Sequence, residues 1–248
     1  MRVEYAEISL IGSRERNEDR VAVAVAEEAA LLLVADGMGG HADGARAAEL
    51  TQKTLIEAFW HTPLPAFDPI GFLHLTLGAA HEAVVSYGRD RPMEQRPRAT
   101  CAVCLVQRGN AYWSHVGDSR VYLIRGGAIV ARTRDHSHVE NLLREGVIVP
   151  AQAAAHPMRN FVESCIGGET LLPQMSTSGR RKLEPGDVLL ACTDGLWGSL
   201  KDEDVAASFA TTDIALAKQL GGLAKRAVEA NGASSDNTSA VVMRWLGP

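Results

Sequence analysis

Residues 31–37 read Leu31-Leu32-Leu33-Val34-Ala35-Asp36-Gly37, a continuous apolar run that ends in a carboxylate and a glycine. Residues 188–195 repeat this arrangement as Val188-Leu189-Leu190-Ala191-Cys192-Thr193-Asp194-Gly195. A short apolar run bounded by turn residues is typical of a buried strand. Each run therefore predicts a central strand of a sheet with an aspartate at its end.

Asp19 and Asp236 also lie where a predicted strand meets a turn, so four aspartates share this position. A carboxylate at the end of a buried strand loses water, and leaving it unpaired is costly. Several such carboxylates brought together repel one another unless a cation holds them. Their oxygens suit a hard divalent ion, Mg²⁺ or Mn²⁺. A lone Asp-Gly usually marks only a turn, so the metal site is predicted from the whole set.

The composition is that of an ordinary globular chain, because 46% of the 248 residues are hydrophobic and 22% are charged. The formal net charge of −5 and the lack of a Lys- and Arg-rich run argue against nucleic acid as the main partner. No apolar stretch has the roughly 20 residues of a membrane span, and the first residues lack the apolar core of a secretory signal. Four cysteines make no disulfide framework. We therefore expect a single domain over residues 1–248, a cytoplasmic location and no membrane partner.

The apolar pattern predicts strands that pair through hairpins and helices that come in consecutive couples. The turns Arg108-Gly109-Asn110 and Gly126-Gly127 each separate two predicted strands. Because helices do not alternate with strands, antiparallel α+β layers are favoured over a doubly wound parallel sheet. The predicted strands are 3–11, 20–26, 29–35, 99–107, 111–116, 121–124, 128–132, 174–179, 187–192 and 238–245, and the predicted helices are 44–60, 69–87, 202–209 and 213–231.

Two groups of residues suggest metal or redox chemistry that the sequence does not support. Cys101 and Cys104 lie in a predicted strand, where their odd separation points them to opposite faces. His136 and His138 are only two residues apart on a segment predicted to be exposed, so we discount them as ligands. The regular pattern fades between residues 135 and 168, which predicts an insertion.

Five short elements follow one another in order along the chain. They are Gly12-Ser13-Arg14-Glu15-Arg16-Asn17-Glu18-Asp19, Asp36-Gly37-Met38-Gly39-Gly40-His41, Gly117-Asp118-Ser119-Arg120, Thr193-Asp194-Gly195-Leu196 and Asp236-Asn237-Thr238. In these elements the sequence resembles the PPM family, the metal-dependent Ser/Thr protein phosphatases also called type 2C, in its bacterial form. The resemblance covers nearly the whole chain. It departs from many relatives at Arg98-Ala99-Thr100, Glu163-Ser164 and Asn237-Thr238-Ser239, none of which contains a predicted ligand.

The resemblance implies an α+β fold with four layers, an α/β/β/α sandwich whose two antiparallel sheets pack face to face and are flanked by helix pairs. It implies two core ions, Mn²⁺ or Mg²⁺. The matching core carboxylates are Asp19, Asp36, Asp194 and Asp236. Asp36 matches the residue that bridges both ions, and the backbone carbonyl of Gly37 adds an oxygen. Asp118 matches a residue that helps to hold a weaker third ion.

The implied activity is hydrolysis of phosphoserine and phosphothreonine in proteins, by in-line attack of a water between the ions and without a phosphoenzyme. Arg14 matches the arginine that grips the phosphate, with Arg16 as a close rival. His41 matches the histidine proposed to protonate the leaving oxygen, beside Asp36 as the second catalytic residue. Residues 135–168 resemble a flap beside the site, in which His156 contacts substrate.

The implied partners are phosphorylated proteins and a bacterial Ser/Thr kinase of the eukaryotic type, with a monomer as the simplest assembly. Two alternatives remain open: a phosphatase-like regulatory module without turnover, and an enzyme that hydrolyses small-molecule phosphoesters. Retention of all four core carboxylates argues against the regulatory module. Comparing rates on a phosphopeptide and on nucleotides would identify the small-molecule enzyme.

Overall fold

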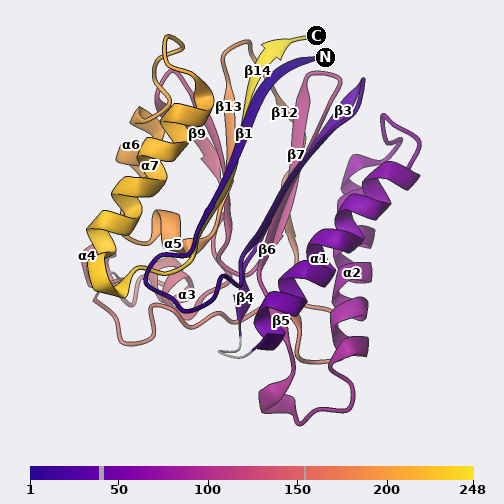
Figure 1. Cartoon of the computed structure of the whole chain (residues 1–248), viewed down its shortest axis with the longest axis vertical. Coiled ribbons are helices and arrows are strands. Elements are labelled where there is room, and N and C mark those ends of the chain that lie inside the picture. Colours follow the sequence, from indigo (N-terminus) through magenta and orange to yellow (C-terminus); the bar gives the residue numbers. More distant parts are fainter. Residues whose placement is uncertain (39–41, 154) are drawn as a thin grey trace.

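The structure is a computed structural model that describes residues 1–38, 42–153 and 155–248. Two antiparallel sheets lie face to face, and helices cover the outer face of each sheet (Figure 1). The predicted α+β class and the predicted four layers are thereby confirmed. None of the described helices combines the length and the apolar character that a membrane span requires.

The order of the strands within each sheet follows from their antiparallel pairing. Sheet 1 consists of β1 (Arg2–Leu10), β14 (Thr238–Gly247), β13 (Val188–Cys192), β8 (Arg120–Arg125) and β9 (Ala128–Arg132). Sheet 2 consists of β11 (Ser176–Thr177), β7 (Asn110–Val116), β6 (Cys101–Gln107), β3 (Ala29–Ala35) and β2 (Arg20–Val25), with β12 (Arg181–Lys182) also beside β7. A small sheet contains β10 (Ile166–Gly167), β5 (Arg98–Ala99) and β4 (Gly37–Met38).

Each sheet is covered by its own set of helices. Sheet 2 is covered by α1 (Ala42–His61) and α2 (Pro69–Tyr87), and sheet 1 by α5 (Asp194–Trp197), α6 (Asp202–Ala207) and α7 (Leu216–Asn231). Two further helices, α3 (His138–Arg144) and α4 (Pro150–Ala153), lie between β9 and β10 in the chain, and η1 (Met93–Gln95) and η2 (Gly232–Ser234) are short 3₁₀ turns.

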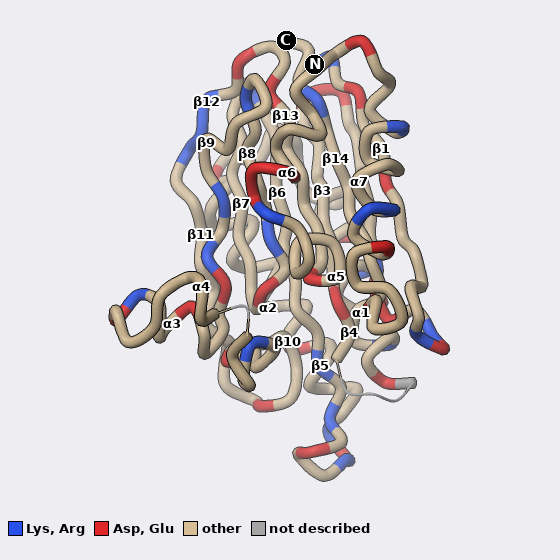
Figure 2. Tube along the Cα trace, turned by 90° about the vertical axis from the view of Figure 1, so that its left-hand side faces the viewer, with Lys and Arg blue, Asp and Glu red and all other residues tan. Residues whose placement is uncertain are grey.

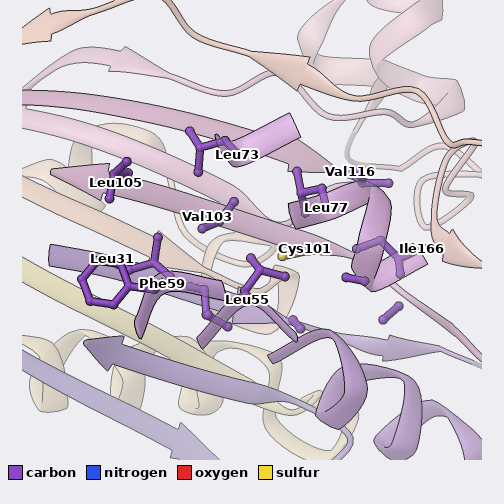
Figure 3. Packing of buried hydrophobic residues seen from close by; sticks show 14 of the residues in the cluster. Leu31, Leu55, Phe59, Leu73, Leu77, Cys101, Val103, Leu105, Val116 and Ile166 are labelled. Atoms are coloured by element: carbon purple, nitrogen blue, oxygen red, sulfur yellow. The ribbon is translucent and has the colours of Figure 1, made fainter. Parts of the chain in front are cut away.

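The continuous apolar run of β3 is explained by burial on both faces of sheet 2. Leu31 and Leu33 pack against the helices, whereas Leu32 and Val34 pack between the two sheets. Figure 3 shows Leu31 among Phe59 and other apolar residues of the helix-facing core. Because successive strand residues point to opposite faces, a strand in the middle of a layered fold needs apolar residues throughout.

The cysteine prediction is confirmed by the same alternation. Cys101 lies in the core between sheet 2 and its helices, and Cys104 lies in the core between the sheets. Burial raises the pKa of the Cys101 thiol to about 12, so this thiol stays protonated.

Most predicted strands and helices are confirmed to within a few residues, but three expectations are wrong and one small sheet was missed. The segment after β13 forms the short helix α5 and not a turn at Asp194-Gly195. The strand predicted at 174–179 is reduced to β11, and the small third sheet was not predicted at all. Two-residue strands carry no periodicity, so only their tertiary partners define them. His136 is buried, with 7% exposure, and not on an exposed segment.

Candidate active site

Four predicted ligands lie at strand ends, two from each sheet. Asp19 directly precedes β2 and Asp36 directly follows β3, and these strands pair in sheet 2. Asp194 begins α5 just after β13, and Asp236 lies just before β14, the partner of β13 in sheet 1. Figure 1 shows α5 and β4 at the end of the sandwich away from the chain termini, and acidic segments gather near these elements in Figure 2.

These strand ends surround one cavity of about 1030 Å³. Asp36, Asp194 and Asp236 line this cavity, together with Asp118 and Gly37. Asp19 is not part of the lining and is only 3% exposed, but its charge raises the pKa of Asp36. The structure therefore brings the predicted carboxylates together from distant parts of the chain. Their assignment as metal ligands stays a prediction.

The carboxylates interact strongly enough to change one another's ionisation. Burial, followed by the charges of Asp19, Asp194, Asp118 and Asp236, raises the pKa of Asp36 well above its usual range. Burial likewise raises the pKa of Asp19 to about 7 and that of Asp194 to about 6. Without a counter-charge, this cluster would hold protons near neutral pH. A bound cation would displace these protons.

The donor set fits a hard divalent cation. The Oδ1 atoms of Asp19 and Asp194 are buried and have no hydrogen-bond partner within the described part of the chain. Such orphaned oxygens are costly unless a ligand satisfies them. In residues 1–38, 42–153 and 155–248, no three potential ligands form a closed cluster at metal-binding distances. The carboxylates line an open space, and the side chains of Asp36 and Asp194 share a hydrogen bond.

Gly37 occupies a position that admits no side chain. An added Cβ would overlap the backbone carbonyl of Gly44 in α1 and lie 2.9 Å from the Glu18 carbonyl oxygen. This tight packing explains the glycine after Asp36 independently of any backbone flexibility. It also brings the start of α1 close to the segment that leads into Asp19.

Asn237 joins the N-terminal loop to the start of β14, a role that sequence reasoning missed. Its Oδ1 accepts a hydrogen bond from the Glu18 backbone N–H at 2.9 Å. Its Nδ2 donates to the carbonyl oxygens of Ile11 at 2.8 Å and Arg16 at 3.0 Å. A buried amide with three backbone partners fixes the loop between Ile11 and Glu18. The asparagine that follows Asp236 in the motif was the available signal.

Arg14 lies at the mouth of the cavity. Its Nη2 donates to Asp236 Oδ2 at 2.7 Å, and the two side chains are 60% and 37% exposed. An exposed pair of this kind is worth little free energy, so the guanidinium is available to a competing anion. Arg16 also lines the cavity. The choice between Arg14 and Arg16 as the phosphate ligand therefore stays open.

The two predicted histidines have different outcomes. His41 lies outside the described residues. His156 lies on the 135–168 segment, where its Nδ1 accepts from the Met158 backbone N–H at 3.2 Å, and it lines neither cavity at the site. Asn160, from the same segment, lines both of these cavities. Substrate contact by His156 stays a prediction.

A second cavity of about 500 Å³ opens beside the first. The two cavities share four lining residues, Asp118, Asn160, Asp194 and Asp236. Arg120 lies in the wall of the second cavity, where it makes a bidentate pair with Asp135 at 2.7 and 2.8 Å. Its guanidinium also lies 3.3 Å from the centre of the Trp197 ring. This network ties the start of the 135–168 segment to β8 and α5.

Comparison with known proteins identifies relatives of this chain. The profile of the family described as Protein phosphatase 2C matches residues 9–227. The serine/threonine protein phosphatase PstP of Mycobacterium tuberculosis is 32% identical over 230 residues, which cover 92% of this chain. The protein phosphatase PhpP of Streptococcus pneumoniae is 32% identical over 216 residues, which cover 86% of this chain and 85% of PhpP.

The fold is also similar to a solved structure of the catalytic domain of PstP in complex with two manganese ions. The TM-score is 0.81 at 28% identity, and 98% of this chain and 97% of that chain are covered. The aligned region is 42% of full-length PstP. The chain belongs to the protein phosphatase 2C family; of the two relatives, PhpP is named a protein phosphatase and PstP a serine/threonine protein phosphatase.

Proposed function

We propose that this chain hydrolyses phosphoserine and phosphothreonine in proteins and depends on Mn²⁺ or Mg²⁺. The observation that carries the proposal is the convergence of five acidic residues from both sheets, two of which have buried oxygens without a partner. The PstP structure with two manganese ions supports this choice of ions for the present chain. The single-domain organisation and the role of residues 135–168 as a flap belong to the same proposal.

The residues of this chain would divide the work as follows. Asp19, Asp36, Asp194 and Asp236 would hold two core ions, with Asp36 between them and the Gly37 carbonyl as a further oxygen, and Asp118 would help to hold a weaker third ion. When bound, the ions lower the pKa of a water and neutralise phosphoryl charge.

Arg14 would orient the phosphate, because it is exposed at the cavity mouth and its partner Asp236 lies within the same lining. Burial of Asp36 and Asp194 lowers the local dielectric, so their carboxylates, once ionised, would attract a dication more strongly than exposed carboxylates do. His41 would protonate the leaving oxygen. A phosphorylated protein, and through it a Ser/Thr kinase, would be the partner.

The deciding experiment compares wild type with Asp36→Asn on a phosphothreonine peptide, p-nitrophenyl phosphate and a nucleotide, with and without Mn²⁺. We expect Mn²⁺-dependent release of phosphate from the peptide by wild type and a loss of at least about 10³-fold in the variant. Unchanged far-ultraviolet circular dichroism of Asp36→Asn would show that folding is preserved. Turnover by the variant would contradict the metal assignment, no wild-type turnover would favour a regulatory module, and preference for the nucleotide would favour a small-molecule enzyme.

A further inference from the structure

The turn between β7 and β8 carries Asp118 and is held by a residue far along the chain. The Gly117 N–H donates to His136 Nδ1 at 3.2 Å, and the His136 backbone N–H donates to the Gly117 carbonyl oxygen at 2.9 Å. One residue thus satisfies both backbone groups of Gly117. Because Nδ1 accepts a hydrogen bond, the proton of the neutral ring lies on Nε2.

His136 is itself fixed from three other directions. Its Nε2 lies 2.8 Å from Ser176 Oγ, and its ring stacks on His115 with the ring centres 4.5 Å apart. Its backbone carbonyl accepts from the Glu163 N–H at 2.8 Å. Since the side chain is buried as well, the ring cannot turn away from Gly117 without breaking several contacts.

The backbone on either side of the Asp118 side chain is restrained by separate contacts. The Trp197 Nε1–H donates to the Asp118 carbonyl oxygen at 3.1 Å. Ser119 Oγ lies 2.7 Å from Thr100 Oγ1. Asp118 lines both cavities of the site, and neither of these contacts involves its carboxylate.

We propose that His136 is a positioning residue that fixes the Asp118 carboxylate for the third ion by clamping Gly117. The inference rests on the proposed function. His136 also lies where both ends of the 135–168 segment meet, since Ser137 forms a β-bridge with Val162. The position of this segment and the turn that carries Asp118 are therefore connected through one residue, His136.

Two amide substitutions, each of which mimics one ring nitrogen of His136, separate the clamp from mere packing. In His136→Asn the amide oxygen can take the place of Nδ1 and accept from Gly117, whereas the contact with Ser176 is lost. In His136→Gln the amide can reach Ser176, whereas the acceptor for Gly117 is lost. Both variants lose the stacking on His115, so each is the stability control of the other.

The readout is Mn²⁺ binding to the purified full chain, measured by isothermal titration calorimetry and by electron paramagnetic resonance of free Mn²⁺. We expect the weakest Mn²⁺ site to keep its affinity within about threefold in His136→Asn and to lose about tenfold or more in His136→Gln, as for other residues that orient ligands. The tighter sites should be unchanged in both variants. With a phosphopeptide, His136→Gln should need more Mn²⁺ for half-maximal rate.

Equal Mn²⁺ isotherms for the Asn and Gln variants would overturn the inference. If neither variant folds, His136→Phe provides the same test, because it keeps an aromatic ring against His115 and removes the acceptor for the Gly117 N–H. An unchanged weakest site in His136→Phe would then overturn the inference. If wild type binds no Mn²⁺ at all, the proposed function itself fails, which is distinct from a failure of the clamp alone.

Discussion

Asp19→Asn should make the metal-free protein more stable at pH 8. The wild-type carboxyl is buried, and its pKa rises from 3.8 to about 7 because of desolvation and the charges of Asp194 and Asp236. At 1.36 kcal/mol per pH unit this rise corresponds to about 4 kcal/mol. We expect a gain of about 2–4 kcal/mol, the lower value if the new amide N–H finds no acceptor. The hydrogen bond from Thr193 Oγ1, 2.9 Å in wild type, can be kept by the amide oxygen.

The loss of wild-type stability with rising pH follows from proton linkage. Below pH 3.8 the carboxyl is protonated in both the folded and the unfolded state, so it costs nothing. Between pH 3.8 and about 7 only the unfolded state ionises, and wild type therefore loses stability as the pH rises. Above pH 7 the loss is complete and constant. The Asn variant lacks this contribution at every pH.

The assay is urea unfolding in the presence of EDTA at pH 5 and pH 8. The stability difference between Asp19→Asn and wild type should grow by about 2–3 kcal/mol between the two pH values. Because the Asp19 charge also raises the pKa of Asp36, the difference reports the titration of Asp19 together with its effect on Asp36. Asp90→Asn, at an exposed position, is the matched control and should show no such growth. A difference that is the same at pH 5 and pH 8 would refute the reasoning.

Two further pairs of substitutions test the framework of the site and its phosphate contact. Gly117→Ala should cost about 3 kcal/mol in urea unfolding, because Gly117 has φ +93° and an added Cβ would lie 2.6 Å from Thr100 Cγ2. Gly126→Ala, at φ +56° with open space around it, should cost only about 1 kcal/mol, and equal costs would contradict the packing argument. Arg14→Ala should raise KM for a phosphopeptide about tenfold, the effect of one lost charge-assisted contact, and Arg16→Ala less than about threefold. The reverse order would assign phosphate binding to Arg16.

The parts of the molecule that could be predicted are those marked by a pattern of neighbouring residues in the sequence. The apolar run of β3 and the alternation that separates Cys101 from Cys104 depend only on strand geometry and burial, so both expectations were confirmed. The convergence of the aspartates was also expected, because a charge at the end of a buried strand is destabilising unless it is paired or binds a cation.

Features created only by tertiary contacts could not be predicted in this way. His136 follows a polar stretch and looks exposed, yet Ser176 and His115 cover it. No pattern around Trp197 indicates more than packing, yet its N–H donates to the Asp118 backbone carbonyl. The hydrogen bonds of Asn237 to Glu18 and Ile11 join segments more than 200 residues apart, which no local pattern encodes.

The placement of the site links catalysis to the stability of the sandwich. One acidic pair ends strands of sheet 2 and the other ends strands of sheet 1, so their mutual repulsion acts across the seam between the two sheets. The hydrogen bond from Thr193, next to β13, to Asp19, next to β2, crosses the same seam. A cation that binds both pairs would turn this repulsion into attraction, and it binds only the folded state. Metal binding should therefore stabilise the contact between the sheets at the end of the molecule that holds the site. At the end where the termini lie, the apolar core between the sheets holds them together without a metal.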